Sequence, residues 1–195
     1  MDHTQENNID KILLEKFEQE IWDKVPHLEG AKIINSTPLP GIYNVIDPNG
    51  IVEEYSDSMN NWLNNIDLTI VFDIGDYRRV GDIAKQVYGH CTSVSIDHHP
   101  IKQNTPFDIN IVDSSAPATG YLLWKYFQHV NFTDDKLPIN IASALYASIV
   151  TDTGSFKYQC TTADTHYMAA HLIESGVDCY KIQNIDRKIF LNIFL

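Results

Sequence analysis

The sequence predicts one α/β domain, spanning residues 1–195, with a doubly wound, mainly parallel sheet flanked by helices. Residues 68–72 form a nearly continuous apolar run, which is typical of a buried strand in a parallel sheet. Residues 92–96 alternate small polar and apolar side chains, which also indicates a strand. A helical pattern over residues 80–88 joins the two. A strand, a helix and a second strand in this order favour a right-handed βαβ unit and a parallel sheet.

The other elements follow from local patterns along the chain. Near the N-terminus, Ile9, Leu13, Phe17 and Ile21 recur every four positions, which predicts an amphipathic packing helix over residues 9–25. A short strand at 31–35 precedes a turn-forming segment rich in proline, and residues 59–65 indicate a helical turn. Further along, we expect a strand at 109–112 and helices at 116–130, 141–151 and 162–175.

Composition limits the classes of function. The formal net charge of −12 argues against binding long nucleic acid by bulk electrostatics, which requires basic surfaces. Short anionic substrates stay open, because a bound divalent cation can supply the local positive charge. No stretch approaches the roughly 20 apolar residues of a membrane span, and the polar, acidic start does not resemble a signal peptide. The three widely spaced cysteines predict neither a disulfide framework nor a thiolate zinc site, which favours a reducing cytoplasm.

Three acidic groups stand where predicted elements end. Asp73 follows the strand at 68–72, and Asp97, His98 and His99 follow the strand at 92–96, which Pro100 prevents from continuing. Asp152 ends the helix at 141–151, where a carboxylate faces the negative end of the helix dipole and needs a nearby cation. In open α/β sheets, ligands bind beyond the carboxyl ends of the strands. The sequence therefore predicts that these side chains converge on one metal-binding crevice.

Three ordered motifs carry a resemblance to a known family: Phe72-Asp73-Ile74-Gly75-Asp76, Asp97-His98-His99 and Thr151-Asp152-Thr153-Gly154-Ser155-Phe156. They resemble the second, third and fourth motifs of the DHH phosphoesterases, and the branch they match best is that of the nanoRNase-like oligoribonucleases and PAP phosphatases within the RecJ-like superfamily. The resemblance covers roughly residues 31–195. It implies a hydrolase that acts on short oligonucleotides or 3′,5′-bisphosphate nucleotides.

The resemblance also implies a role for each residue. Asp73 would bridge two divalent ions, usually Mn²⁺, while His98 and Asp152 would complete the ligands of the second ion. Mg²⁺ and other divalent ions stay open. His99 would contact the phosphoryl group of the substrate. Asp97 would be either a nearby ligand or a residue that orients the histidines. Asp97, His98 and His99 together would form the catalytic group.

The chain departs from the family pattern at both ends, so we expect a catalytic domain that is truncated there. Where the first motif places a histidine and two acids, the chain has His3, Asn7 and Ile9, with Glu6 or Asp10 as weak substitutes. The smaller, substrate-gripping domain of the family is not seen after residue 195. Two hypotheses follow: a phosphoesterase that is impaired as it stands, or an inactive domain that binds a metal, a nucleotide or a partner protein.

The expected loss of an opening strand also bears on stability. In the family that strand lies beside the one that ends at Asp73, so residues 68–72 would keep a row of unpaired backbone groups. Unpaired buried groups cost about 1–3 kcal/mol each, and an exposed strand edge is a template for pairing with another chain. We therefore expect marginal stability or self-association into homo-oligomers.

Overall fold

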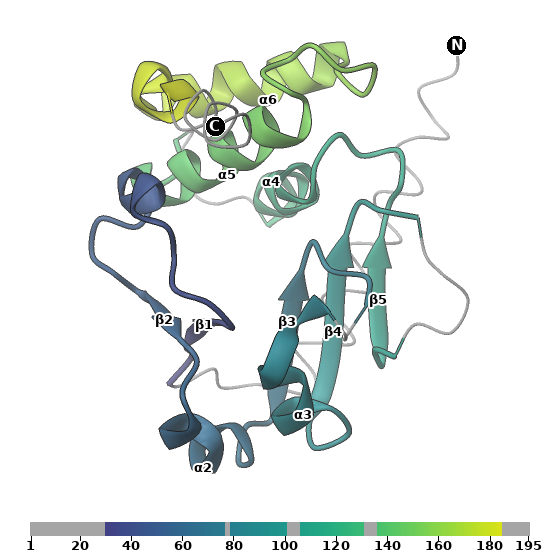
Figure 1. Cartoon of the computed structure of the whole chain (residues 1–195). Helices are drawn as coiled ribbons and strands as arrows, with labels where there is room; N and C mark the ends of the chain where they lie inside the picture. Colours follow the sequence, from purple (N-terminus) through teal and green to yellow (C-terminus); the bar gives the residue numbers. More distant parts are fainter. Residues whose placement is uncertain (1–29, 77–78, 101–105, 131–135, 185–195) are drawn as a thin grey trace, which may run out of the picture.

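The computed structural model describes residues 30–76, 79–100, 106–130 and 136–184. Within them the chain forms two parallel sheets and a set of helices (Figure 1). The strands are β1 (Ile33–Asn35), β2 (Val52–Glu54), β3 (Leu68–Phe72), β4 (Thr92–Asp97) and β5 (Ile109–Val112). The helices are α2 (Asn60–Leu63), α3 (Ala84–Val87), α4 (Thr119–His129), α5 (Ile139–Asp152) and α6 (Ala163–Glu174). The amphipathic helix predicted at 9–25 lies outside the described residues.

The larger sheet has the order β3-β4-β5, and both strand pairs are parallel. Its register places Ile70 beside Val94 and Val94 beside Ile109, so that one face is apolar and packs on leucines of α4. On the opposite face, Val71 packs with residues of α2 and α3. Helices therefore cover both faces of this sheet. The predicted α/β class, with parallel sheets flanked by helices, is confirmed.

The smaller sheet pairs β1 with β2 in parallel and stands apart from β3-β4-β5. Sequence analysis predicted a strand in the region of β1 but none at β2. The two strands are short and largely exposed, and Lys32 beside them forms an ion pair with Glu53 at 2.7 Å. A strand of three residues carries too few side chains to show a period, which explains why β2 was missed.

Several predicted helices shift at their ends for local reasons. The helix predicted from residue 116 begins at Thr119 instead, because Ala118 before it is extended, with a φ of −164° and a ψ of 155°. The helix predicted at 80–88 is a 3₁₀ turn, Gly81–Ile83, followed by the short α3. It ends early because Tyr88 is extended and Gly89 has a φ of +74°. At α6, Thr162 forms a capping box with Thr165, so the helix begins at Ala163, one residue inside the predicted boundary.

A layer of three helices lies beyond the carboxyl ends of β3, β4 and β5 (Figure 1). Helices α4, α5 and α6 share an apolar core of buried residues that includes Ile149, Met168 and Leu172. The crossing of α4 and α5 is close at Gly120, where an added Cβ would lie 2.7 Å from Ser148. No helix in the described part of the chain is both long and apolar enough to cross a membrane. The carboxyl ends of the strands face this helical layer (Figure 1).

Strand β3 is an edge strand among the described residues, so the amides of Ile70 and Val71 should exchange with solvent at very different rates. The Asp73 amide donates to the Ile96 carbonyl at 2.9 Å, which places the odd-numbered groups of β3 toward β4 and the even-numbered groups away from it. We expect slow exchange at Val71 and fast exchange at Ile70 in hydrogen-exchange NMR of the monomer. Equally slow exchange at both amides would mean that another segment pairs with this edge, and would contradict the predicted open edge.

Candidate metal centre

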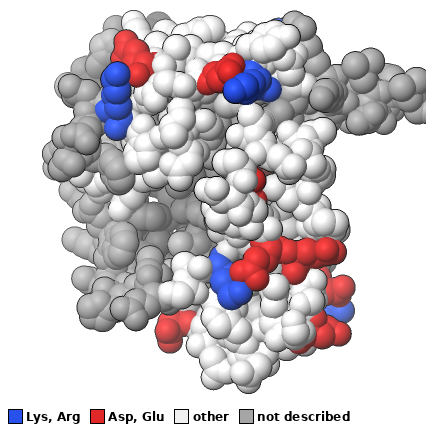
Figure 2. Space-filling view, turned by 90° about the vertical axis from the view of Figure 1, so that its left-hand side faces the viewer, with Lys and Arg blue, Asp and Glu red and all other residues white. Residues whose placement is uncertain are grey.

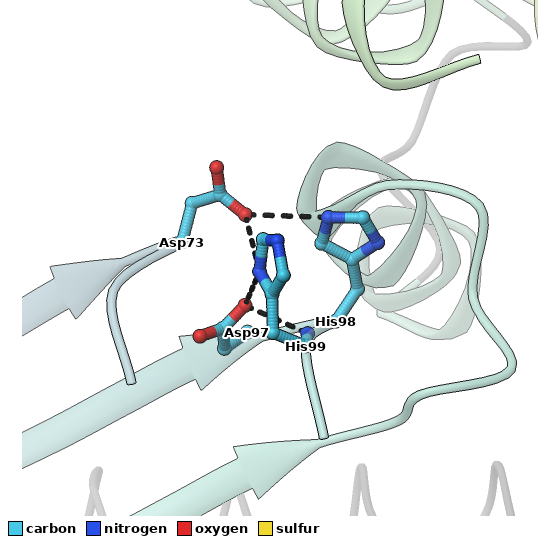
Figure 3. Close-up of side chains that lie close together, drawn as sticks. All are labelled: Asp73, Asp97, His98 and His99. Carbon is cyan, nitrogen blue, oxygen red and sulfur yellow. Dashed lines mark hydrogen bonds and ion pairs between the residues drawn. The ribbon is translucent and has the colours of Figure 1, made fainter. Parts of the chain in front are cut away.

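The carboxyl ends of β3 and β4 and the end of α5 bring the predicted site residues together. Asp73 directly follows β3, Asp97 is the last residue of β4, and Asp152 is the last residue of α5. His98 and His99 follow β4, and their rings stand 4.4 Å apart in an edge-to-face arrangement. Figure 3 shows Asp73, Asp97 and both imidazoles gathered at the strand ends. The five side chains thus come from three elements that are distant in the sequence.

Asp73 adopts a left-handed backbone conformation with a φ of 60°. This conformation is uncommon for residues other than glycine and is tolerated best by Asp and Asn. It turns the chain sharply out of β3 while the Asp73 amide still bonds to β4. One carboxylate oxygen, Oδ1, points toward the two histidines, and the other points away from them (Figure 3). Such strain at a strand end is frequent at ligand sites.

The His98 ring is held by a backbone carbonyl. Its Nδ1 lies 3.2 Å from the Ala116 oxygen, and because a carbonyl can only accept, Nδ1 carries the proton. The other ring nitrogen, Nε2, faces two carboxylates, 3.5 Å from Asp73 Oδ1 and 3.8 Å from Asp152 Oδ2. Atoms that each lie about 2.1 Å from one ion are at most about 4.2 Å apart. His98 and either carboxylate could therefore share an ion, since each separation is within this limit.

His99 is oriented by Asp97. Its Nδ1 lies 2.8 Å from Asp97 Oδ1, and its backbone amide donates to the same oxygen at 2.9 Å. The other ring nitrogen, Nε2, belongs to a side chain that is 53% exposed. The Asp97 side chain is buried, and no hydrogen-bond partner of its Oδ2 is found within the described residues. Asp97 thus holds an imidazole that is open to solvent on its other side.

Excess negative charge characterises this centre. Burial raises the pKa of Asp152 to about 6, and the neighbouring Asp73 carboxylate adds to the rise, while His98 and His99 oppose it. Within the described residues, the basic side chains at ion-pair distance from Asp73, Asp97 and Asp152 are these two histidines, with no lysine or arginine among them. Buried carboxylates without cations are costly. A divalent cation would offset this charge, so the residues fit a metal ion.

One further grouping supports that fit. Ligand atoms from Asp73, Asp97, His98 and His99 all lie within 4.8 Å of one another. This cluster contains Asp97 and His99, whereas the predicted ligand set was Asp73, His98 and Asp152. Both sets share the Asp73 carboxylate and the His98 ring. The roles of the individual residues stay predictions.

Two contacts of the centre were not predicted. Thr119 donates its hydroxyl proton to Asp73 Oδ1 at 2.8 Å, and the Ala116 carbonyl holds His98. In the sequence, a threonine near the start of a predicted helix indicates a capping residue. In the structure the residue before α4 is Ala118, and its side chain makes no capping bond. Only the fold shows that the Thr119 side chain turns toward a carboxylate.

Comparisons with known proteins find relatives of low sequence identity. No family model matches the chain. An uncharacterized protein of Mycoplasma genitalium is 34% identical over 121 residues, which cover 60% of this chain and 34% of that protein. The bifunctional oligoribonuclease and PAP phosphatase NrnA of Bacillus subtilis is 32% identical over 108 residues, which cover 55% of this chain and 33% of NrnA. The chain is distantly similar to the DHH phosphoesterases.

Two further matches bear on this similarity. A probable bifunctional oligoribonuclease and PAP phosphatase NrnA of Streptococcus mutans is 27% identical over 163 residues, which cover 73% of this chain and 51% of that protein. A crystal structure of an exopolyphosphatase-related protein from Bacteroides fragilis superposes with a TM-score of 0.71 at 18% identity, covering 90% of this chain and 50% of that chain. The latter shows a shared fold. The chain spans between about a third and a half of the length of the curated proteins that it matches.

Proposed function

We propose that this chain is a divalent-metal-dependent phosphoesterase that acts on short oligonucleotides or 3′,5′-bisphosphate nucleotides. The observation that carries the proposal is the position of His98 Nε2, which faces Asp73 and Asp152 with its proton held on the opposite nitrogen. Mixed carboxylate and imidazole ligands suit Mn²⁺, and Mg²⁺ or another divalent ion is a further candidate. The similarity to NrnA supports the substrate class.

In this proposal Asp73, His98 and Asp152 hold the ion, which would activate water and stabilise negative charge that develops on the phosphoryl oxygens. His99 presents its exposed ring to the phosphoryl group, and Asp97 fixes the orientation of that ring through Nδ1. The Asp73 oxygen that points away from the histidines could serve a second ion (Figure 3). His3, Glu6 and Asp10, which the sequence offers as remnants of the first motif, are outside the described residues.

Surface charge agrees with a short substrate. On the face shown in Figure 2, basic side chains lie beside acidic ones and form no continuous basic surface. Among the described lysines, Lys32 pairs with Glu53 and Lys85 with Asp82. Long nucleic acid would need phosphate contacts from many free basic groups. A dinucleotide or a bisphosphate nucleotide needs only the local charge of the ion.

We expect slow, Mn²⁺-dependent hydrolysis, well below the turnover of about ten per second that is common among enzymes, because one ion cannot stabilise both the attacking and the leaving oxygen. The measurement is release of mononucleotide from a dinucleotide, and of phosphate from a 3′,5′-bisphosphate nucleotide, with and without Mn²⁺. His99→Ala should abolish what activity there is. Turnover near ten per second would contradict the expected impairment and indicate a complete second site.

The alternative is an inactive domain that binds a metal, a nucleotide or a partner. It is favoured by the single cluster of potential metal-binding side chains found in the described part of the chain. The same assay separates the two hypotheses. Mn²⁺ binding without any hydrolysis of either substrate would reject the phosphoesterase and retain the binding domain.

A further inference from the structure

We propose that Thr119 is a positioning residue of the metal centre, whose hydroxyl holds the Asp73 carboxylate with Oδ1 facing the two imidazoles. The inference rests on the proposed function, because it assigns a role toward the same ion. Its basis is the 2.8 Å contact between Thr119 Oγ1 and Asp73 Oδ1. A carboxylate that is ionised can only accept, so the hydroxyl proton must point at Asp73.

The two partners differ in how firmly the protein holds them. The Asp73 side chain is 46% exposed, so packing alone does not fix its rotation. Thr119 is only 4% exposed, and its β-branched side chain has restricted rotation. The hydrogen bond from this restrained hydroxyl therefore limits the rotation of the exposed Asp73 carboxylate. The Thr119 hydrogen bond uses one lone pair of Asp73 Oδ1 and leaves another lone pair free to bind an ion.

The segment that carries Thr119 is itself tied to the rest of the centre. Three residues before Thr119, the Ala116 carbonyl accepts from His98 Nδ1 at 3.2 Å. One residue after it, the Gly120 amide donates to Ser148 Oγ at 3.1 Å, and Ser148 stands about one helical turn before Asp152 on α5. Segment 116–120 thus contacts Asp73 and His98 directly and bonds to the helix that delivers Asp152. It sets the relative positions of the three proposed ligands.

A different interpretation is that the hydroxyl only stabilises the start of α4. The Ala118 side chain makes no capping bond there, so a lost side-chain contact could loosen the helix end. The two interpretations predict different results. A residue that positions a ligand controls metal affinity, and removal of such a contact typically costs about 10- to 100-fold in affinity. A residue that only stabilises the helix changes the unfolding temperature of the metal-free protein and leaves affinity unchanged.

The experiment compares Mn²⁺ affinity, by calorimetry and by the electron paramagnetic resonance of free Mn²⁺, in the parent chain and three variants. Thr119→Val removes the hydroxyl and keeps the shape of the side chain, and Thr119→Ser keeps the hydroxyl. Thr165→Val is the matched control, because it removes the same kind of buried hydroxyl from the start of α6, where Thr165 Oγ1 accepts from the Thr162 amide at 3.0 Å and does not contact Asp73. We expect affinity about 10- to 100-fold weaker in Thr119→Val and close to the parent in the other two variants.

Circular dichroism of the metal-free proteins shows whether each variant folds, and Thr119→Ala replaces Thr119→Val if the buried methyl group prevents folding. Equal affinity in the parent and in the variant that lacks the hydroxyl would overturn the inference while leaving the metal site intact. An equal loss of affinity in Thr119→Ser or in Thr165→Val would also overturn it. If the parent binds no Mn²⁺, the proposed function fails and this inference fails with it.

Discussion

Replacing His98 with alanine should abolish Mn²⁺ binding. We expect the parent chain to bind one ion with a dissociation constant in the micromolar range or weaker, because three protein ligands make an open site. His98 Nε2 lies 3.5 Å from Asp73 Oδ1 and 3.8 Å from Asp152 Oδ2, so the ring stands between the two carboxylates. Without it, the carboxylates lose the only nitrogen in the predicted ligand set. Calorimetric titration of both proteins with Mn²⁺ measures the difference.

His90→Ala is a suitable control for this experiment. His90 is exposed and precedes the amino end of β4, whereas His98 follows its carboxyl end. The His90→Ala variant should bind Mn²⁺ like the parent. Because the side chain of His98 is only 16% exposed, its removal could also disturb packing, and circular dichroism should show that the variant is folded. Equal Mn²⁺ binding by the parent and a folded His98→Ala would remove His98 from the ligand set and leave the cluster of Asp73, Asp97 and His99 to explain the binding.

Much of the site could be predicted because each residue stands at a boundary that local sequence defines. The apolar run before Asp73 and the alternation before Asp97 mark buried parallel strands, and parallel strands end at the same edge of a sheet. Asp152 ends a helix whose extent is legible from its small and apolar residues. The end of a strand or helix can therefore be predicted from the sequence when the pattern of apolar residues within that element is strong.

The parts that could not be predicted depend on contacts between distant segments. Thr119 reaches Asp73 across 46 positions, and nothing near either residue distinguishes this contact from a helix cap. The pairing of β1 with β2 is likewise set by the fold, since strands of three residues show no period. The tautomer of His98 follows from the Ala116 carbonyl, which is a backbone group with no sequence signature. Local patterns place residues at an edge, whereas the fold decides which atoms meet there.

Replacing Asp152 with asparagine should stabilise the metal-free chain at neutral pH and remove the stabilisation that Mn²⁺ provides. The pKa of Asp152 is raised to about 6, mainly by burial and then by the Asp73 carboxylate. An ionised Asp152 at pH 7 therefore costs stability, and an asparagine side chain of similar shape avoids the charge. From roughly 1.4 kcal/mol per pKa unit, and with a side chain that is 25% exposed, we expect a gain of about 1–3 kcal/mol. Urea unfolding with and without Mn²⁺ measures both effects.

The pH dependence gives this prediction a definite sign. In the unfolded chain Asp152 loses its proton near its ordinary pKa of 3.8, whereas in the folded chain it keeps the proton up to about pH 6. Between these values the folded state binds more protons than the unfolded state. Protonated Asp152 therefore contributes stability that is fully present below pH 3.8 and is lost as the pH rises through about 6. The asparagine side chain does not titrate, so the Asp152→Asn variant should lack this decline.

Metal binding should show the opposite dependence on pH. An ion needs the ionised carboxylate, so protonation of Asp152 below about pH 6 competes with Mn²⁺ and weakens its binding to the parent chain. The same carboxylate would thus destabilise the empty fold at neutral pH and stabilise the metal-bound fold, which is the behaviour of a ligand rather than of a structural residue. If Asp152→Asn were less stable than the parent without metal and gained as much stability from Mn²⁺, Asp152 would be a structural residue at the end of α5. The ion would then be held by Asp73 and the two histidines.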